Sequence, residues 1–297
     1  MSLFDECELV EVGAHRTRVR IEGDPAGPPV LLLHGLGRSL EDWRVTAAVL
    51  APAHRVIRMD LPGFGLSPRP VAMADLASLV RGVQETLDVL GLHEPLHVAG
   101  NSLGGAVAAQ LLVTAPERVR SLILVDPAGF GAEVTVLLRL LTVPGIGWLA
   151  TRRTARAGAR MLSSRIFADR SLVTAEEVDR AVALGNQVGA GDFLVAMAAG
   201  LGTWRGVRPD WRARLAEGLA ASPRPTLLVW GEQDRVLPIS HLQEALRVLP
   251  HAEVVRYPRT GHAPQIERAE EFAARVVDFI ASTEGTTGRA VPGTRIR

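Results

Sequence analysis

The sequence has 297 residues, of which 47% are hydrophobic and 22% charged, and its formal net charge is +1. A chain of this length can bury roughly three quarters of its unfolded surface in one large or two small domains, while its near-neutral charge gives no electrostatic case for a nucleic-acid partner. All 33 basic residues are arginines and Cys7 is the single cysteine, which excludes lysine-based covalent chemistry, an internal disulfide and a thiolate metal cage, and predicts a soluble cytoplasmic protein.

The first predicted elements are two antiparallel edge strands at residues 7–12 and 15–21, because hydrophobic and polar residues alternate in both. The next run, residues 30–33, is apolar throughout, as expected of a parallel strand covered on both faces. It leads into His34-Gly35-Leu36-Gly37. These glycines would let a backbone amide approach a ligand and build an oxyanion hole, or they would simply punctuate a loop.

A helix at residues 40–50 and a strand at residues 54–59 are expected next. Asp60 ends that strand and could be catalytic, but it precedes the candidate nucleophile described below, so we expect a structural role. Residues 74–90 place leucine and valine at spacings of three and four, which predicts an amphipathic helix stopped by Gly91.

The candidate nucleophile lies in Gly100-Asn101-Ser102-Leu103-Gly104, between the apolar run 96–99 and a run of small residues. A buried strand, a five-residue turn and a helix fit this pattern. In such a turn the middle residue is held in a strained conformation, and the flanking positions must be glycine or nearly so, because a Cβ would collide with the adjoining backbone. Ser102 is therefore the candidate nucleophile, and the alternative is a glycine-rich turn with an exposed serine.

Residues 119–125 form the next predicted buried strand, which ends at Asp126. Strands that alternate with helices at this spacing predict a doubly wound, mostly parallel sheet with ligands at the carboxyl ends of its strands. His34, Ser102 and Asp126 all fall at that edge of the predicted sheet.

Residues 130–222 interrupt the alternation, since we find no strand pattern there and expect helices at residues 134–141, 175–184 and 193–201. Both ends of such an insertion emerge at the carboxyl edge of the sheet, so we expect a helical cap over the site. The predicted division is a core of residues 1–129 and 223–282, a cap of residues 130–222 and a disordered tail of residues 283–297.

The apolar stretch at residues 134–150 is too short for a membrane span and is interrupted by Arg139, so we expect a cap helix and no stable membrane insertion. Arg152, Arg156 and Arg160 share one helical face, which would bind an acidic substrate or, as is usual for such charges, face solvent. Apolar and aromatic side chains of the cap are candidates either to line a substrate pocket or to form the cap's own core. These candidates are Leu137, Leu138, Trp148, Phe193, Met197 and Trp204.

Two further strands are predicted at residues 226–230 and 253–257, and a helix at residues 269–281 closes the domain. Among the histidines outside the candidate site, His97 is expected in the core of a strand, whereas His54 and His241 are expected at the surface.

The remaining candidate catalytic groups follow from what a serine nucleophile requires. A serine hydroxyl needs a base to take its proton and a carboxylate to orient that base. His262 follows the last predicted strand in a glycine-preceded loop, which distinguishes it among the eight histidines. The chain order Ser102, Asp234, His262 is that of a nucleophile elbow, an acid and a base on such a sheet. Asp126 is the alternative acid, because it ends a strand at the same edge.

Five motifs in this order make the sequence resemble the α/β-hydrolase superfamily, specifically its capped members. They are HGLG at 34, DLPGFGLS at 60, GNSLGG at 100, GEQD at 231 and GH at 261. The resemblance implies an eight-stranded sheet with a helical cap after the sixth strand, no cofactor and a small-molecule substrate. It also implies Ser102 as nucleophile, His262 as general base and then acid, and Asp234 as the orienting carboxylate. The backbone N–H groups of Leu36 and Leu103 would form the oxyanion hole.

The resemblance specifies the substrate less closely. GNSLGG and the run DPAGFG at 126 are similar to carbon–carbon bond hydrolases of ring-cleavage products, but those enzymes typically show HGGGPG and GHW where this sequence has HGLGRS and GHA. We therefore expect a small to medium apolar carboxylic ester, with carbon–carbon bond cleavage as the alternative. The fold also serves acyltransferases and ligand receptors, and the sequence leaves the oligomeric state open.

Overall fold

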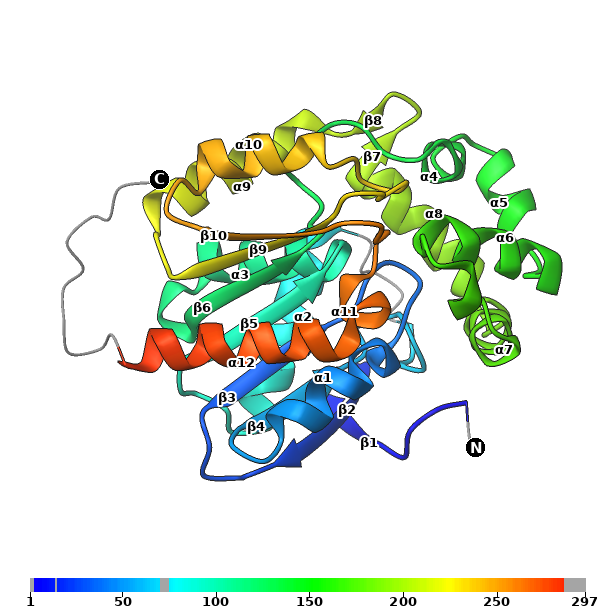
Figure 1. Ribbon diagram of the computed structural model, residues 1–297. Coiled ribbons are helices and arrows are strands. Elements are labelled where there is room, and N and C mark those ends of the chain that lie inside the picture. Colours follow the sequence, from blue (N-terminus) through cyan, green and yellow to red (C-terminus); the bar gives the residue numbers. More distant parts are fainter. Residues whose placement is uncertain (1–2, 14, 70–74, 286–297) are drawn as a thin grey trace.

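The computed structural model describes residues 3–13, 15–69 and 75–285, which fold around an eight-stranded sheet (Figure 1). Its strands are β1 (Glu8–Val12), β2 (His15–Gly23), β3 (Pro29–Leu33), β4 (Arg55–Met59), β5 (Leu96–Asn101), β6 (Val119–Val125), β9 (Thr226–Gly231) and β10 (Glu253–Tyr257). Their order is β1-β2-β4-β3-β5-β6-β9-β10. The pairs β1–β2 and β2–β4 are antiparallel and the other pairs are parallel, which confirms the predicted mostly parallel sheet.

Strand β3 illustrates how the apolar runs build two cores. All its residues are buried, and successive side chains of a strand point to opposite faces of the sheet. Val30 and Leu32 pack on one face in a cluster with Trp43, whereas Leu31 and Leu33 belong to the cluster on the other face. A strand covered on both faces therefore needs the continuous apolar run that the sequence has.

Helices cover both faces of the sheet (Figure 1). On one face α1 (Arg44–Leu50), which follows η1 (Leu40–Trp43), packs against α12 (Ala269–Gly285). On the other face α2 (Leu76–Val89), α3 (Leu103–Thr114), α9 (Pro209–Ala221) and α10 (Ser240–Val248) form a row of packed neighbours. The short helices η2 (Pro116–Arg118) and α11 (Pro264–Glu267) precede β6 and α12.

The predicted start of a disordered tail is too early in the chain. Helix α12 continues to Gly285, so residues 283–285 are helical, and the rest of the predicted tail lies outside the described residues. The buried side chains of Phe279 and Ile280 anchor this last part of the helix, and the Ser282 hydroxyl donates a hydrogen bond to the Phe279 carbonyl.

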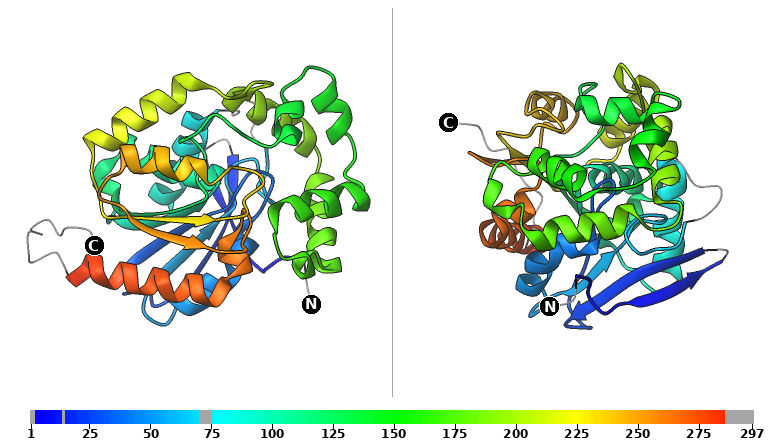
Figure 2. Two further views of the ribbon diagram at one scale, coloured as in Figure 1. Left: turned by 45° about the horizontal axis from the view of Figure 1, so that its top comes forward. Right: turned by 90° about the vertical axis from the view of Figure 1, so that its right-hand side faces the viewer.

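Between β6 and β9 the chain forms an insertion of helices, and Figures 1 and 2 show α4–α8 gathered beyond the end of the sheet where β9 and β10 finish. Its elements, besides α9, are α4 (Val136–Leu141), α5 (Ile146–Thr151), α6 (Arg156–Ile166), η3 (Arg170–Leu172), α7 (Ala175–Gly185), α8 (Ala190–Leu201), β7 (Gly202–Thr203) and β8 (Gly206–Val207). The small β7–β8 hairpin contradicts the expectation that this region has no strand, because two-residue strands are too short to show an alternating pattern. Within the described part of the chain no single helix is long and apolar enough to span a membrane. Helices α7 and α8 have that length and apolar character only when taken together, and the pair is bent by 85°.

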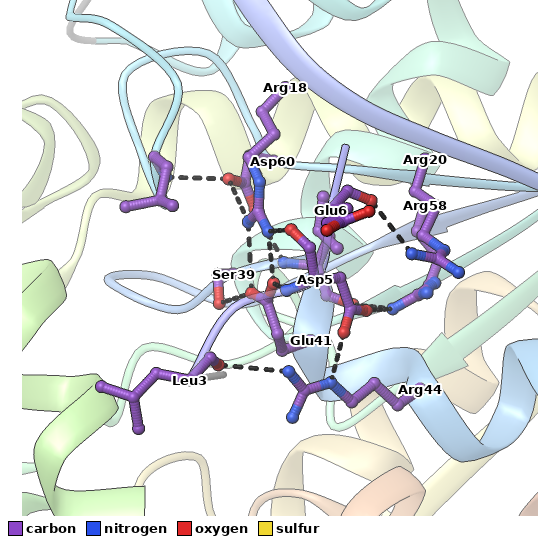
Figure 3. A network of polar contacts seen from close by, with 12 residues as sticks. Leu3, Asp5, Glu6, Arg18, Arg20, Ser39, Glu41, Arg44, Arg58 and Asp60 are labelled. Atoms are coloured by element: carbon purple, nitrogen blue, oxygen red, sulfur yellow. Dashed lines mark hydrogen bonds and ion pairs between the residues drawn. The ribbon is translucent and has the colours of Figure 1, made fainter. Parts of the chain in front are cut away.

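A buried polar network surrounds Asp60 at the end of β4 (Figure 3). One carboxylate oxygen of Asp60 accepts a hydrogen bond from the Leu40 amide at 2.8 Å, and the other accepts from Arg18 at 3.2 Å and from the Leu66 amide at 2.8 Å. Arg18 also pairs with the buried Glu41. These contacts fasten the loops after β3 and β4 to β2, so Asp60 has a structural role in the fold.

Candidate active site

Ser102 lies at the tip of a sharp turn between β5 and α3. Its backbone has φ +55° and ψ −113°, a conformation that side-chain-bearing residues rarely adopt. A Cβ on Gly100 would lie 2.2 Å from the Gly104 carbonyl oxygen, and one on Gly104 would lie 2.3 Å from the Leu33 carbonyl oxygen. Only glycine fits at both positions, so the local sequence permits the strand, turn and helix of a nucleophile elbow.

The loop that follows β3 lies against this turn. A Cβ on Gly35 would be 3.4 Å from the Ser102 Cβ. The buried His34 ring holds the loop, since its Nε2 accepts a hydrogen bond from the Leu61 amide at 2.9 Å and its Nδ1 lies 2.7 Å from the Gly35 carbonyl oxygen. Within the described residues the Leu36 amide makes no hydrogen bond, and the Leu103 amide begins α3, where no preceding helical turn supplies an acceptor. Leu36 and Leu103 both line the cavity that Ser102 lines.

Asp234 and His262 form a hydrogen-bonded pair. Asp234 follows β9 and His262 follows β10, and parallel pairing of these strands brings the two loops together. The His262 Nδ1 lies 2.6 Å from Asp234 Oδ2, while Oδ1 accepts hydrogen bonds from the Val236 and Leu237 amides at 2.7 and 3.0 Å. With Nδ1–H donating to the carboxylate, Nε2 is the acceptor nitrogen of the ring.

Asn101 connects the turn that holds Ser102 (the serine turn) to the loop after β10 that holds Gly261 and His262 (the histidine loop). Its side-chain amide nitrogen donates hydrogen bonds to the His262 carbonyl at 2.9 Å and to the Val125 carbonyl at 3.1 Å. The Ser102 amide donates to the same Val125 oxygen at 3.0 Å. Sequence reasoning missed this role of Asn101, although its place beside the candidate nucleophile and at a strand end was a usable signal.

Glu267 is a second residue that sequence reasoning missed. Its carboxylate accepts hydrogen bonds from the Gly261 amide at 2.6 Å and from the Ala168 and Asp169 amides at 2.9 and 3.0 Å. The His262 amide in turn donates to the Ile166 carbonyl at 2.7 Å. The histidine loop is therefore fastened to the end of α6, although burial raises the pKa of the Glu267 carboxyl.

Asp126 lies beside the Asp234–His262 pair and is completely buried. One of its oxygens accepts a hydrogen bond from the Gly231 amide at 3.0 Å. Burial, and then the nearby Asp234 charge, raise the pKa of Asp126 well above the ordinary value for an aspartate. The surroundings of Asp126 therefore disfavour its charged form. Ligand atoms of Asp126, Asp234 and His262 lie within 4.8 Å of one another, and within this group His262 Nδ1 and Asp234 Oδ2 are hydrogen-bonded to each other.

An apolar cavity of about 80 Å³ opens to solvent beside Ser102. Leu36 and Leu103 line it next to the serine, and Val134 and Leu138 line it from the insertion. Residues from α8, from the β7–β8 hairpin and from α9 complete the wall. A cavity with this lining suits a small apolar ligand.

Of the six side chains predicted to line a pocket, Leu138 lies in this wall and the other five do not. Phe193 packs edge-on against Phe64, with ring centroids 5.0 Å apart, and Met197 is completely buried in the core. On α8 it is Ala198, the next residue, that reaches the cavity, because neighbouring positions on a helix point in directions about 100° apart. Leu137 is likewise displaced from the cavity by helical phase.

Trp148 and Trp204, also predicted as pocket residues, are exposed instead. The guanidinium of Arg152 lies 4.6 Å from the Trp148 ring, and that of Arg205 lies 5.1 Å from the Trp204 ring. Stacking of arginine on indole lets these rings remain at the surface.

The predicted surface positions of His54 and His241 are corrected by the structure, since both side chains are buried. His241 packs edge-on to Trp230 at 6.3 Å and its Nε2 lies 3.1 Å from a Glu133 oxygen. His241 is buried because α10, on which it lies, docks on the sheet, and no local pattern specifies that docking. His97 is buried in β5, as expected.

Comparison with known proteins agrees with the fold. The sequence matches the family described as alpha/beta hydrolase fold over residues 28–269. A 2-hydroxy-6-oxononadienedioate/2-hydroxy-6-oxononatrienedioate hydrolase from Comamonas testosteroni is 32% identical over 281 residues, which cover 92% of this chain and 94% of that protein. A dihydrolipoyllysine-residue acetyltransferase component of the acetoin cleaving system from Cupriavidus necator is 35% identical over 269 residues, covering 90% of this chain and 67% of that protein.

Among solved structures, a membrane phospholipase A superposes with a TM-score of 0.78 and 29% identity, covering 94% of this chain and 86% of that one. The family match spans most of the chain, and the sheet order and the serine turn agree with it. The protein therefore belongs to the α/β hydrolase family.

Proposed function

We propose that the protein is a serine hydrolase that cleaves a small to medium apolar carboxylic ester through an acyl-enzyme on Ser102. The observation that carries the proposal is that Ser102 lines an apolar cavity while its neighbour Asn101 holds the backbone of His262. The hydrogen bond between His262 and Asp234 supplies an oriented base in the same place.

In the first step the Ser102 Oγ attacks the ester carbonyl carbon while the His262 Nε2 takes the hydroxyl proton. Asp234 accepts the Nδ1 hydrogen at 2.6 Å and so holds the tautomer in which Nε2 is the acceptor. The tetrahedral intermediate collapses when the alcohol leaves with the proton from His262, and the acyl group stays on Ser102. A water molecule then gives a proton to His262 and attacks the acyl carbon. The bond between that carbon and Ser102 Oγ breaks, His262 returns the proton to Oγ, and the carboxylic acid is released.

The amides of Leu36 and Leu103 would stabilise the negative oxygen of both tetrahedral intermediates. The packing of Gly35 against Ser102 and the start of α3 at Leu103 support this role. The N-terminus of α3 also adds a partial positive charge at that oxygen.

Asp234 is the acid of the proposed triad, and Asp126 is not. Three hydrogen-bond donors meet the Asp234 carboxylate, from His262, Val236 and Leu237. Asp126 is completely buried with a raised pKa. The charged form of Asp126 is therefore disfavoured, whereas Asp234 meets the His262 Nδ1 and is placed to stabilise the imidazolium that forms there.

We infer that residues 130–222 act as a cap over a core of residues 1–129 and 223–282. The cavity supports this division, since Leu138 and Trp211 line it from the insertion and Leu103 lines it from the core. The cap would then select the acyl or aryl group of a small-molecule substrate by size and apolar character. A cytoplasmic location completes the proposal, because a chain with Cys7 as its one cysteine cannot form an internal disulfide.

Carbon–carbon bond cleavage is the second candidate function. It is supported by the 32% identity to the Comamonas testosteroni hydrolase, whose chain is covered almost completely, and by the GNSLGG and DPAGFG runs. Acyl transfer from Ser102 to an acceptor other than water is a third candidate, supported by the 35% identity to the acetyltransferase component.

The experiment that separates the candidates compares kcat/KM for nitrophenyl butyrate with kcat/KM for 2-hydroxy-6-oxo-6-phenylhexa-2,4-dienoate. We expect ester turnover with a burst of nitrophenol, and a preference for the ester of at least about 100-fold. Ser102→Ala is the matched control for turnover at the proposed site. A preference for the dienoate would establish the second candidate, and acceleration by an added thiol or alcohol with formation of its ester would establish the third.

A further inference from the structure

Exposed apolar side chains are concentrated on two short helices of the insertion, α4 and α5. They are Val136, Leu140, Ile146, Trp148 and Leu149, with exposed fractions of 65%, 40%, 47%, 50% and 67%. Val136 and Leu140 are four residues apart, and Ile146 and Leu149 are three apart, so each pair shares one side of its helix. The two helices contact each other and both pack on α8, and Figure 1 shows α5 farther from the sheet than α8. The two neighbouring helices therefore both expose apolar side chains.

Positive charge without acidic residues accompanies these side chains. Residues 134–168 contain six arginines and no aspartate or glutamate. Arg152 and Arg153 directly follow α5 and are exposed, and Arg152 lies over the ring of Trp148. Neither has a carboxylate partner among the residues that the structure describes, whereas Arg156 pairs with Asp179. We call the five apolar residues together with Arg152 and Arg153 the α4–α5 face.

We propose that the α4–α5 face binds reversibly to the surface of a bilayer that contains anionic phospholipids. Exposed leucine, isoleucine and valine side chains can enter the boundary between headgroups and acyl chains, and tryptophan favours that depth. Arginines at the edge of the face can reach the lipid phosphates while their aliphatic stems stay on apolar surface. The apolar side chains thus match the acyl-chain boundary of the bilayer, and the arginines match its layer of phosphates.

The charge argues against a second copy of the chain as the occupant of this face. In a two-fold symmetric dimer the same patch lies on both partners. Arg152 and Arg153 of one copy would then approach those of the other, and no acidic residue of the 134–168 segment could neutralise them. An anionic lipid surface has the complementary charge.

Membrane binding would extend the proposed function. Its biological use rests on that function, whereas the experiment that tests it does not. Helix α4 has two sides: Leu138 and Arg139 line the cavity next to Ser102, while Val136 and Leu140 lie on the exposed side. An apolar ester partitions from water into a bilayer. Docking through the α4–α5 face would therefore bring the cavity wall to the place where such a substrate accumulates.

The test measures sedimentation of the full chain with vesicles of phosphatidylcholine alone and of phosphatidylcholine with phosphatidylglycerol. The Ser102→Ala protein is used, so that hydrolysis cannot alter the lipids and the result does not depend on activity. We expect binding to the anionic vesicles that weakens as salt is raised. The double variant Trp148→Ala/Leu149→Ser should bind at least about tenfold more weakly, and Arg152→Gln/Arg153→Gln at least about fivefold more weakly with less salt dependence.

Val89→Ser, which removes an exposed apolar side chain from α2 on another part of the surface, is the control and should bind like the parent. The proposal is overturned if the parent protein does not bind anionic vesicles, or if it binds both kinds of vesicle equally. It is also overturned if Trp148→Ala/Leu149→Ser abolishes a concentration-dependent dimer and leaves vesicle binding unchanged, since a second copy would then be the partner. Turnover of a water-soluble ester by wild-type protein is measured separately and tests the proposed function alone.

Discussion

Two neighbouring carboxyl groups at the candidate site, Asp126 and Asp234, differ in what surrounds them. Asp234 accepts hydrogen bonds from His262 and from two backbone amides, whereas Asp126 accepts from the Gly231 amide and is buried with a raised pKa. Two carboxylates this close would repel each other if both were charged. The surroundings of Asp126 are therefore the ones that disfavour a charge.

The difference predicts unequal effects of removing each acid. Asp234→Asn should lower kcat for an aryl ester by roughly 10⁴-fold, because an amide can hold the His262 ring in the wrong tautomer. Asp126→Asn should cost less than about tenfold, since its amide oxygen can still accept from Gly231 and its NH₂ group can replace a carboxylic proton. Steady-state kinetics of both variants, with thermal unfolding to verify folding, make the comparison. The opposite ranking would give the catalytic role to Asp126.

At this scale the sequence predicts residues whose roles follow from motif and chain order. The glycines around Ser102, and the positions of Asp234 and His262 after late strands, were sufficient to nominate all three. Asn101 and Glu267 could not be nominated in the same way, because their partners are distant in sequence: the Asn101 contact with His262 joins residues separated by 161 positions. Such contacts depend on how strands pair, which no local pattern records.

Among the elements, the histidine loop depends on its fastening to the end of α6. Glu267 accepts from three backbone amides, one in the histidine loop and two beyond α6. Glu267→Ala would leave these donors without an acceptor, at a cost of about 2–4 kcal/mol in the free energy of unfolding. We expect kcat for a small ester to fall about tenfold or more with little change in KM, because the base is displaced while the cavity is retained.

Hydrogen exchange supplies the second measurement for this variant. The amides of Ala168, Asp169 and Gly261 should exchange faster in Glu267→Ala than in wild type, while the amides of α2 should not change. Unaltered exchange at these three amides together with wild-type kcat would mean that Glu267 does not position the histidine loop.

The helices of the insertion predict how activity depends on acyl length. Each methylene that fits the cavity should favour binding by up to about 0.8 kcal/mol, so kcat/KM should rise along a nitrophenyl ester series and fall where the cavity ends. Ala198→Leu places a larger side chain in the wall and fills part of the cavity, so the acyl length with the highest kcat/KM should become shorter. Trp148→Ala, which alters an exposed side chain outside the wall, should leave the optimum for short soluble esters unchanged. A decline from acetate onward that neither substitution alters would mean that this cavity does not hold the acyl group.

The same helices show why periodicity alone does not place pocket residues. The predicted helices at residues 175–184 and 193–201 correspond closely to α7 and α8. Yet Met197 lies in the core and Ala198 in the cavity wall. Hydrophobicity indicates that a helix side is covered, but only the packing of α8 against its neighbours decides which side faces the ligand.

For the whole molecule, the buried His97 predicts a loss of stability in mild acid. Burial, together with the nearby Arg120 and His54, lowers its pKa to about 4. Below about 6.5 the unfolded chain binds a proton at this histidine that the folded protein binds only near pH 4, so the free energy of unfolding falls as pH decreases across that interval. A pKa shift of this size corresponds to a decrease of at most about 3 kcal/mol. Glu284, which lies 3.5 Å from the His97 Nε2, would partly stabilise the proton and so make the decrease smaller.

Denaturant unfolding at a series of pH values from 4 to 8 measures this effect. His97→Asn should have a smaller change of unfolding free energy between pH 7 and pH 5 than wild type, whereas His93→Asn, at an exposed position, should match wild type. Equal pH dependence in all three proteins would show that His97 is not the group responsible.

The overall architecture was predictable because its apolar strands, helix periodicities and glycine turns all specify the same alternation. The mostly parallel eight-stranded sheet and the position of the insertion after β6 follow that alternation, whereas the order of the strands was not predicted. The burial of His241 on α10 did not follow from the alternation of strands and helices, and neither did the exposure of Trp148. Both depend on how elements dock.

The most direct test of the proposed function is reaction with a serine-reactive phosphonate, followed by peptide mapping. If Ser102 is the activated nucleophile, ester turnover should be lost in proportion to labelling, with the adduct on the peptide that contains Ser102. His262→Ala should slow the labelling by roughly 10²-fold or more, because the hydroxyl then lacks its base. Full ester turnover after complete labelling of Ser102, or an adduct on a different residue that accounts for the lost turnover, would contradict the proposal.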